Sequence, residues 1–212
     1  MKIELRDLSF APQGKVVFSQ LNYTFTSNGN YLIQGPSGCG KSSLLTFISS
    51  LRQASSGQII IDGQEPVNFC EHRKNCQWLR QTPYIYDKTV RENLSLALAY
   101  HQLAIPSDDE LKKHLQYLFP EGLDLEERAM ELSGGQKHRL ALLRSYLLKP
   151  KALLCDEISA GLDEKSRQLS EDFIFNHCNE MTVIFVSHIQ ESFESRESFT
   201  RLLMSKEGFE PL

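Results

Sequence analysis

The spacing of hydrophobic residues changes several times along the chain and predicts strands that alternate with helices. Residues 3–10 and 16–25 alternate apolar and polar positions on either side of a Pro-Gln-Gly turn, which is the period of a half-buried strand. Short apolar runs between turn residues predict further strands. These are expected at residues 31–34, 58–62, 152–155 and 182–187, with a last pair near Leu202 and Phe209.

Helical spacing occupies the intervals between these strands. The sequence PSDDE at residues 106–110 predicts a helix start inside a polar, helical region at 89–130. Helices are also expected at 164–177 and, as a short one, after residue 187. One face of the helix after the first glycine-rich segment is apolar and should pack on a sheet, with Leu44, Leu45, Ile48 and Leu51. The apolar positions of region 89–130 are Leu94, Leu98, Leu111, Leu115 and Leu118.

This alternation predicts an α/β fold with a mainly parallel sheet that is covered on both faces. The 212 residues suffice for one well-buried domain with an inserted lobe, whereas two independent domains would be crowded. We therefore expect a single domain over residues 1–212. Its core is expected in 1–84 and 150–212, and its helical subdomain at about 85–149.

Composition narrows the classes of function. A formal net charge of -4 gives little electrostatic reason to bind nucleic acid, whose phosphates require a basic surface. No apolar run reaches the roughly 18 to 20 residues that span a bilayer, and the first residues carry charges where a signal peptide is apolar. The 5 cysteines at irregular spacing indicate reduced thiols in a cytosolic protein. Any role at a membrane is therefore expected to come through a partner.

Cysteine and histidine side chains raise two separate hypotheses. Cys70 and Cys76 flank His72, which suggests a metal site, although the spacing matches none of the compact zinc patterns and a fourth ligand is not evident. Cys39 precedes a predicted helix, a position that favours thiolate chemistry. The alternative for Cys39 is a small side chain that fills space.

The sequence GPSGCGKS at residues 35–42 matches the phosphate-loop pattern. Its glycines let successive backbone N–H groups point inward, and the following helix adds its positive N-terminal end. Lys41 is placed to reach the β and γ phosphates of a nucleotide, and the Ser42 hydroxyl to bind Mg²⁺. A glycine-rich turn without a ligand would not require this lysine and hydroxyl. The predicted nucleotide-binding residues are Gly35, Pro36, Ser37, Gly38, Cys39, Gly40, Lys41, Ser42 and Ser43.

An acidic pair follows the apolar strand at 152–155. Asp156 and Glu157 come at its carboxyl end, where open α/β sheets bind ligands. Asp156 is predicted to hold Mg²⁺ or its water. Glu157 is predicted to act as the general base on a water that attacks the γ-phosphate, a role that typically contributes about 10² to 10⁴ in rate. The alternative is that the two acids are simply solvated charges at a strand end. The presence of the phosphate loop opposes this alternative.

The sequence LSGGQ at residues 132–136 opens another helix. Ser133 and Gln136 have the spacing of a capping box. Gly134 and Gly135 are unexplained by a cap alone, because glycine in a helix is less favourable than alanine by up to about 1 kcal/mol. We therefore expect something to approach the backbone closely at these two residues.

LSGGQ resembles the signature of the ATP-binding-cassette (ABC) ATPases, and the resemblance covers nearly the whole chain. It implies a P-loop NTPase core of the RecA-like type, an antiparallel β subdomain and an inserted α-helical subdomain. It also implies that Ser133, Gly134, Gly135 and Gln136 of one subunit cap the γ-phosphate on the phosphate loop of a second. Two ATP molecules with Mg²⁺ would then lie in a head-to-tail homodimer.

Further motifs extend the resemblance. Gln81 is similar to the Q-loop glutamine, which is implied to sense Mg²⁺ and the attacking water and to link to a membrane partner. Residues 159–163 resemble the D-loop, which brings Asp163 to the nucleotide interface. His188 resembles the switch histidine that contacts the γ-phosphate. The implied catalytic residues are Lys41, Gln81, Glu157 and His188, and the implied metal ligands are Ser42, Gln81 and Asp156.

One position departs from the family. Members usually stack adenine on an aromatic residue ahead of the phosphate loop, and the matching residue here is Pro12. Phe10, on the same segment, is the candidate replacement.

The resemblance implies a cytoplasmic ATPase subunit at the inner face of the membrane that energises integral membrane permease subunits. QTP at 81–83 and DEI at 156–158 are similar to FetA-like bacterial iron exporters, which makes iron a candidate solute. One alternative is a soluble ABC-type ATPase that acts on nucleic acid or ribosomes, which the acidic net charge opposes. The other is a regulatory nucleotide-binding module with low turnover, which Glu157 and His188 oppose.

Overall fold

The computed structural model describes two compact units of the chain. Contacts group residues 1–78, 151–157 and 180–212 into a core unit, and residues 79–150 and 158–179 into a helical unit. Every helix of the described residues is too short or too polar to cross a membrane. The described residues are 1–158, 162–187 and 199–212.

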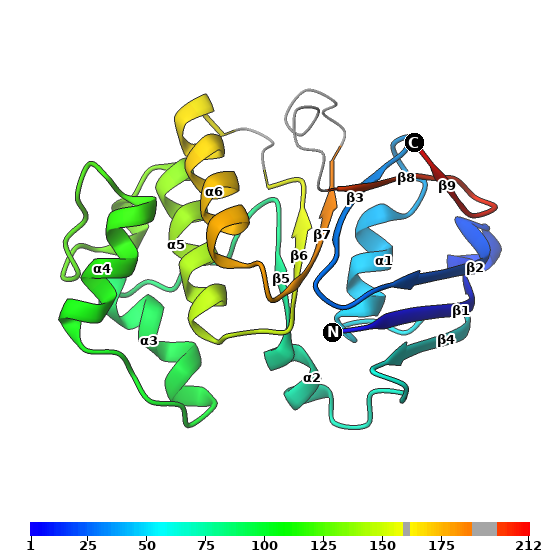
Figure 1. Ribbon diagram of the computed structural model, residues 1–212, viewed down its shortest axis with the longest axis horizontal. Helices are drawn as coiled ribbons and strands as arrows, with labels where there is room; N and C mark the ends of the chain where they lie inside the picture. The colour runs from blue at the N-terminus through cyan, green and yellow to red at the C-terminus, as the bar shows by residue number, and fades with distance from the viewer. Residues whose placement is uncertain (159–161, 188–198) are drawn as a thin grey trace. The chain divides into compact units, whose positions relative to one another are not determined.

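Two sheets build the core unit (Figure 1). The smaller sheet is antiparallel with the strand order β2-β1-β4. The larger has the order β5-β6-β7-β3-β8-β9, and within it the pairs β6–β7, β7–β3 and β3–β8 are parallel. The predicted α/β class with a mainly parallel sheet is confirmed. The strands are β1 (Ile3–Phe10), β2 (Phe18–Phe25), β3 (Asn30–Gln34), β4 (Ser56–Ile61), β5 (Cys76–Leu79), β6 (Ala152–Asp156), β7 (Thr182–Val186), β8 (Thr200–Met204) and β9 (Phe209–Pro211).

The burial of the strands follows their position in the sheets. Every residue of β6 and β7 is buried, as expected for central parallel strands covered on both faces. In β1 the buried residues alternate with more exposed ones, and the pairing register shifts between Leu5 and Leu8. This alternation is typical of an antiparallel strand with one face on the core.

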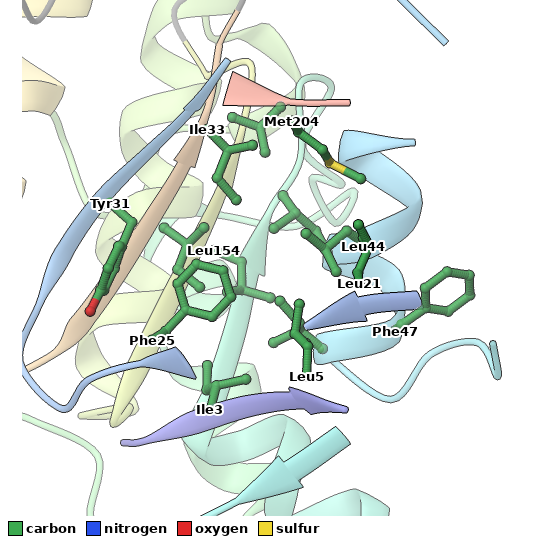
Figure 2. Close-up of a cluster of buried hydrophobic side chains, with 14 of the residues drawn as sticks. Ile3, Leu5, Leu21, Phe25, Tyr31, Ile33, Leu44, Phe47, Leu154 and Met204 are labelled. Atoms are coloured by element: carbon green, nitrogen blue, oxygen red, sulfur yellow. The ribbon is translucent and has the colours of Figure 1, made fainter. Parts of the chain in front are cut away.

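Helix α1 (Lys41–Ile48) packs into the same core cluster as both sheets. Figure 2 shows Leu44 of α1 in one buried cluster with Leu5 of β1 and Leu154 of β6. The expectation that Leu51 shares this buried face was wrong: Leu51 is 53% exposed. The reason is that α1 ends at Ile48, and Ser50 then takes a left-handed backbone conformation with a φ of 54°. A short helix, α2 (Phe69–Asn75), precedes β5.

The helical unit contains α3 (Val90–Tyr100), α4 (Asp108–Leu118), α5 (Gly134–Leu147) and α6 (Glu164–His177). Its helices start where local chemistry favours them, because Thr89 with Glu92 and Ser107 with Glu110 form capping boxes. The apolar residues expected in this region are buried, namely Leu94, Leu98, Leu111, Leu115 and Leu118.

Helix α6 belongs to a different unit from the one expected. The sequence predicts that all of residues 150–212, including α6, belong to the core. Contacts group α6 with the helical unit. The rings of Tyr146 on α5 and Phe173 on α6 lie edge to face with centroids 5.0 Å apart. Helical periodicity shows which face of α6 is apolar but not what covers it. The short helix expected after residue 187 lies outside the described residues.

Candidate functional site

The phosphate loop connects β3 to α1 in the core unit, as the sequence predicts. Gly40 caps α1 in a left-handed conformation with a φ of 103°. A Cβ atom at this position would lie 2.7 Å from the ring of Phe18, so a larger residue would be both strained and crowded. Glycine therefore lets the loop turn sharply into the helix and leaves the first N–H groups of α1 available to an anion.

Lys41 places a buried positive charge in this loop. Its Nζ donates hydrogen bonds to the carbonyl oxygens of Gly35, at 2.8 Å, and Pro36, at 3.1 Å. The residue is only 4% exposed. A buried ammonium that is bound to neutral carbonyl oxygens attracts an anion, and the phosphates of a nucleotide would supply one.

Ser42 and Asp156 meet although they are far apart in the chain. The Ser42 Oγ donates a 2.8 Å hydrogen bond to Asp156 Oδ1, and Asp156 is 7% exposed. Mg²⁺ usually takes one or two carboxylates and completes its shell with phosphate oxygens and water. A hydroxyl and a carboxylate beside a phosphate loop fit this ion. Among the described residues, no cluster of three or more His, Cys, Asp or Glu side chains could hold a metal by itself.

Glu157 follows Asp156 at the end of β6. Its N–H donates to the carbonyl of Val186 at 2.9 Å, and its φ of 49° is left-handed. That conformation is uncommon for a residue other than glycine and marks a turn in the chain. Glu157 lines a cavity of about 270 Å³ together with Lys41, Ser42 and other phosphate-loop residues. The carboxylate predicted to act as a base and the predicted phosphate site thus share one cavity.

Val17 also lines this cavity and was missed by the sequence analysis. It sits just before β2, and its partly buried side chain also packs against the core cluster. The only sequence signal was an apolar residue ahead of a strand, and such residues usually enter the core.

Phe10 does not fill the role that the sequence analysis assigned to it. It is 6% exposed, and its ring packs against Phe47 and Phe18 with centroids 5.0 and 6.0 Å away. The guanidinium of Arg52 covers it at 4.7 Å from the centroid. This ring therefore has no open face for adenine stacking, because its apolar surface is already buried in the core.

The signature helix α5 begins in the helical unit with the predicted capping box. Ser133 N–H donates to Gln136 Oε1 at 2.9 Å, and Gln136 N–H donates to Ser133 Oγ at 3.2 Å. The two glycines differ from one another. A Cβ on Gly135 would lie 2.3 Å from Ser166 Oγ, so α6 of the same chain explains this glycine, whereas a Cβ on Gly134 would meet nothing within 4 Å.

Comparison with known proteins gives the same assignment. A family profile described as ABC transporter matches residues 18–160. The chain belongs to the ABC transporter family. With its phosphate loop, acidic pair and signature sequence, it is an ATP-binding domain of that family.

Named relatives extend this comparison. The chain is 33% identical over 214 residues to the spermidine/putrescine import ATP-binding protein PotA of Mannheimia succiniciproducens, with 97% of this chain and 56% of that protein covered. It is 28% identical over 190 residues to the probable iron export ATP-binding protein FetA of Escherichia coli, covering 88% of this chain and 84% of that protein. It is 35% identical over 202 residues to an ABC-type transporter, kk1G, of Curvularia clavata, covering 88% of this chain and 15% of that protein. The chain thus spans about half or less of two of these relatives.

A solved structure supports the fold. A bacterial Atm1-family ABC exporter with ATP bound superposes with a TM-score of 0.85 at 21% identity, covering 98% of this chain and 37% of that chain. At this level of identity the likeness concerns the fold of the ABC domain.

The remaining predicted site residues of this ABC domain fall in different places. Gln81 and Asp163 belong to the helical unit, whereas Lys41 and Glu157 belong to the core unit. Asp163 caps α6 by accepting a 2.9 Å hydrogen bond from Ser166 N–H, which lowers the pKa of its carboxyl. His188 and most of the D-loop segment lie outside the described residues. Their assignment to the nucleotide stays a prediction.

The cysteines of this ABC domain do not form the metal site suggested by their spacing. His72 is buried, and its Nε2 bonds to the carbonyl of Ile48 at 2.7 Å; burial lowers the pKa of this histidine. Burial also raises the pKa of Cys76 to about 12, while Cys70 is exposed. Cys39 is 4% exposed within the core cluster, which agrees with the hypothesis of a space-filling side chain.

Proposed function

We propose that this ABC domain binds and hydrolyses ATP with Mg²⁺ and so energises a membrane transporter. The observation that carries the proposal is the meeting of Ser42 with Asp156 beside Lys41, in a cavity that Glu157 also lines. These are the groups needed to hold polyphosphate, bind a hard cation and accept a proton from water.

Lys41 and the loop N–H groups would bind the phosphates. Ser42 and Asp156 would hold Mg²⁺. When bound, this ion would neutralise negative charge on the phosphates. Glu157 would take the proton of the attacking water. We assign Gln81 to the metal and the attacking water, and His188 and Asp163 to the γ-phosphate and the dimer interface. These three assignments rest on the family motifs.

We further propose that two copies close around two ATP molecules. Ser133, Gly134 and Gln136 of one copy would cap the nucleotide held by the other. Loss of the γ-phosphate would remove contacts that favour the closed state, and the dimer would reopen. A ligand shifts such an equilibrium only by binding the two states with different affinity.

The domain would act at the cytoplasmic face of a membrane, bound to permease subunits. We name iron export as the first transport reaction to test, because the relative called a probable iron export protein is covered over 84% of its length. Polyamine transport is the alternative, since other relatives are named for spermidine and putrescine import.

The central test compares phosphate release by the wild type and Glu157→Gln in the presence of Mg-ATP. The wild type should turn over, and Glu157→Gln should lose about 10²-fold or more in kcat, as expected for a general base. In light scattering, the Glu157→Gln variant should have the mass of a dimer when ATP is present and of a monomer when it is absent. Glu207→Gln, an exposed acid of the same unit, is the matched control. Equal turnover in Glu157→Gln and the wild type would refute the proposal.

A further inference from the structure

The segment that follows β5 and leads to α3, residues 80–88, has no regular secondary structure. Its backbone polar groups therefore cannot be satisfied by a sheet or helix of their own. Several of them are bound instead by side chains from helices of the same unit. The position of this segment thus depends on a few side-chain contacts.

Two of these contacts come from the signature helix α5. His138 donates from Nε2 to the backbone carbonyl of Gln81 at 2.5 Å, and His138 is 6% exposed. Arg144 donates from Nη2 to the carbonyl of Tyr84 at 2.7 Å. Its guanidinium also lies 5.1 Å from the centroid of the Tyr86 ring.

A third contact comes from α3. Asn93 is fully buried, accepts from Tyr86 N–H at 3.0 Å and donates to the Tyr86 carbonyl at 3.0 Å. Arg144 reaches the same Asn93 amide oxygen at 3.3 Å. One end of the segment is therefore tied to α5 through His138, and the other to α3 and α5 together.

We infer that His138 is a positioning residue that ties the backbone of Gln81 to the signature helix. This inference rests on the proposed function, which assigns Gln81 to Mg²⁺ and the attacking water. Because α5 starts with the signature sequence and also holds Gln81, a displacement of one shifts the other. The contact gives the helical unit a direct mechanical link between a metal-sensing residue and a nucleotide-capping helix.

The donor on residue 138 is the element to test. Glutamine at this position retains an N–H that can reach the Gln81 carbonyl, whereas leucine fills similar space without a donor. His101, at the end of α3, takes no part in these contacts, so His101→Leu serves as the control variant. All variants would be compared with the wild type by ATPase assays over a range of Mg²⁺ concentrations and by amide hydrogen exchange.

We expect His138→Leu to raise the Mg²⁺ concentration for half-maximal turnover about three- to tenfold, the range set by one lost hydrogen bond. Exchange at residues 81–86 should rise by a similar factor, while exchange in α3 is unchanged. His138→Gln should restore both values, and His101→Leu should alter neither. If His138→Leu does not fold, Arg144→Gln carries the same expectation for exchange at residues 84–86.

A normal Mg²⁺ dependence and normal exchange in His138→Leu would overturn the inference while leaving the proposed function intact. The inference would also be overturned if His138→Gln failed to restore the normal Mg²⁺ dependence. In that case the hydrogen-bond donor of residue 138 would not be what positions Gln81. A wild type that does not hydrolyse ATP would refute the proposed function. The exchange experiment would still decide whether His138 holds the segment.

Discussion

The two glycines at the start of α5 allow a matched test of local packing against function. A methyl group on Gly135 would lie 2.3 Å from Ser166 Oγ and 2.8 Å from Ser166 Cβ. Both distances are well inside van der Waals contact, so α5 or α6 must shift. Overpacking of this kind lowers the free energy of unfolding by about 1–3 kcal/mol.

Gly134 has room for the same methyl group, since nothing lies within 4 Å of a Cβ built there. Gly134→Ala should therefore raise the free energy of unfolding by up to about 1 kcal/mol, the difference in helix propensity. The two alanine variants should then differ by about 1–4 kcal/mol, although they are neighbours with the same chemical change.

Urea unfolding followed by circular dichroism would measure this difference. Ser166→Ala removes the atom in closest approach, so the double variant Gly135→Ala/Ser166→Ala should recover part of the loss. ATP turnover gives the second measurement. If Gly134 faces a nucleotide held by another copy, Gly134→Ala should lower turnover despite its higher stability. Equal stabilities for the two single variants would refute the packing argument.

Three further predictions follow from the described contacts. Ser42→Ala should abolish most Mg²⁺-dependent turnover and, through its lost bond to Asp156, lower the free energy of unfolding by about 0.5–1.5 kcal/mol in urea titrations. Phe10→Leu should lower stability by about 1 kcal/mol yet leave ATP affinity, measured by calorimetry, unchanged; a large loss of affinity would reinstate Phe10 as a base contact. His72 has a pKa below the ordinary 6.5, so the unfolded chain binds more protons and stability must fall as pH drops below about 6.5. His72→Gln should show a shallower fall in chemical unfolding between pH 7 and pH 5 than the wild type, and an identical slope would contradict this.

Sequence alone determined the features that depend on local chemistry. The phosphate loop, the acidic pair and the capping boxes are each set by a few neighbouring residues, because backbone turns and helix starts need particular side chains at fixed spacings. Burial of Leu94 and Leu111 likewise followed from helical period. The ABC family assignment rests on these same short motifs.

Tertiary structure decided which residues meet and which surfaces remain open. The bond from Ser42 to Asp156 joins positions 114 residues apart, and no local pattern specifies that distance. Phe10 is buried and Leu51 is exposed, the opposite of what their expected roles require, because burial depends on what the rest of the chain places around a side chain. Gly135 is explained by Ser166 on another helix. These outcomes depend on packing between distant segments, which periodicity and propensity do not encode.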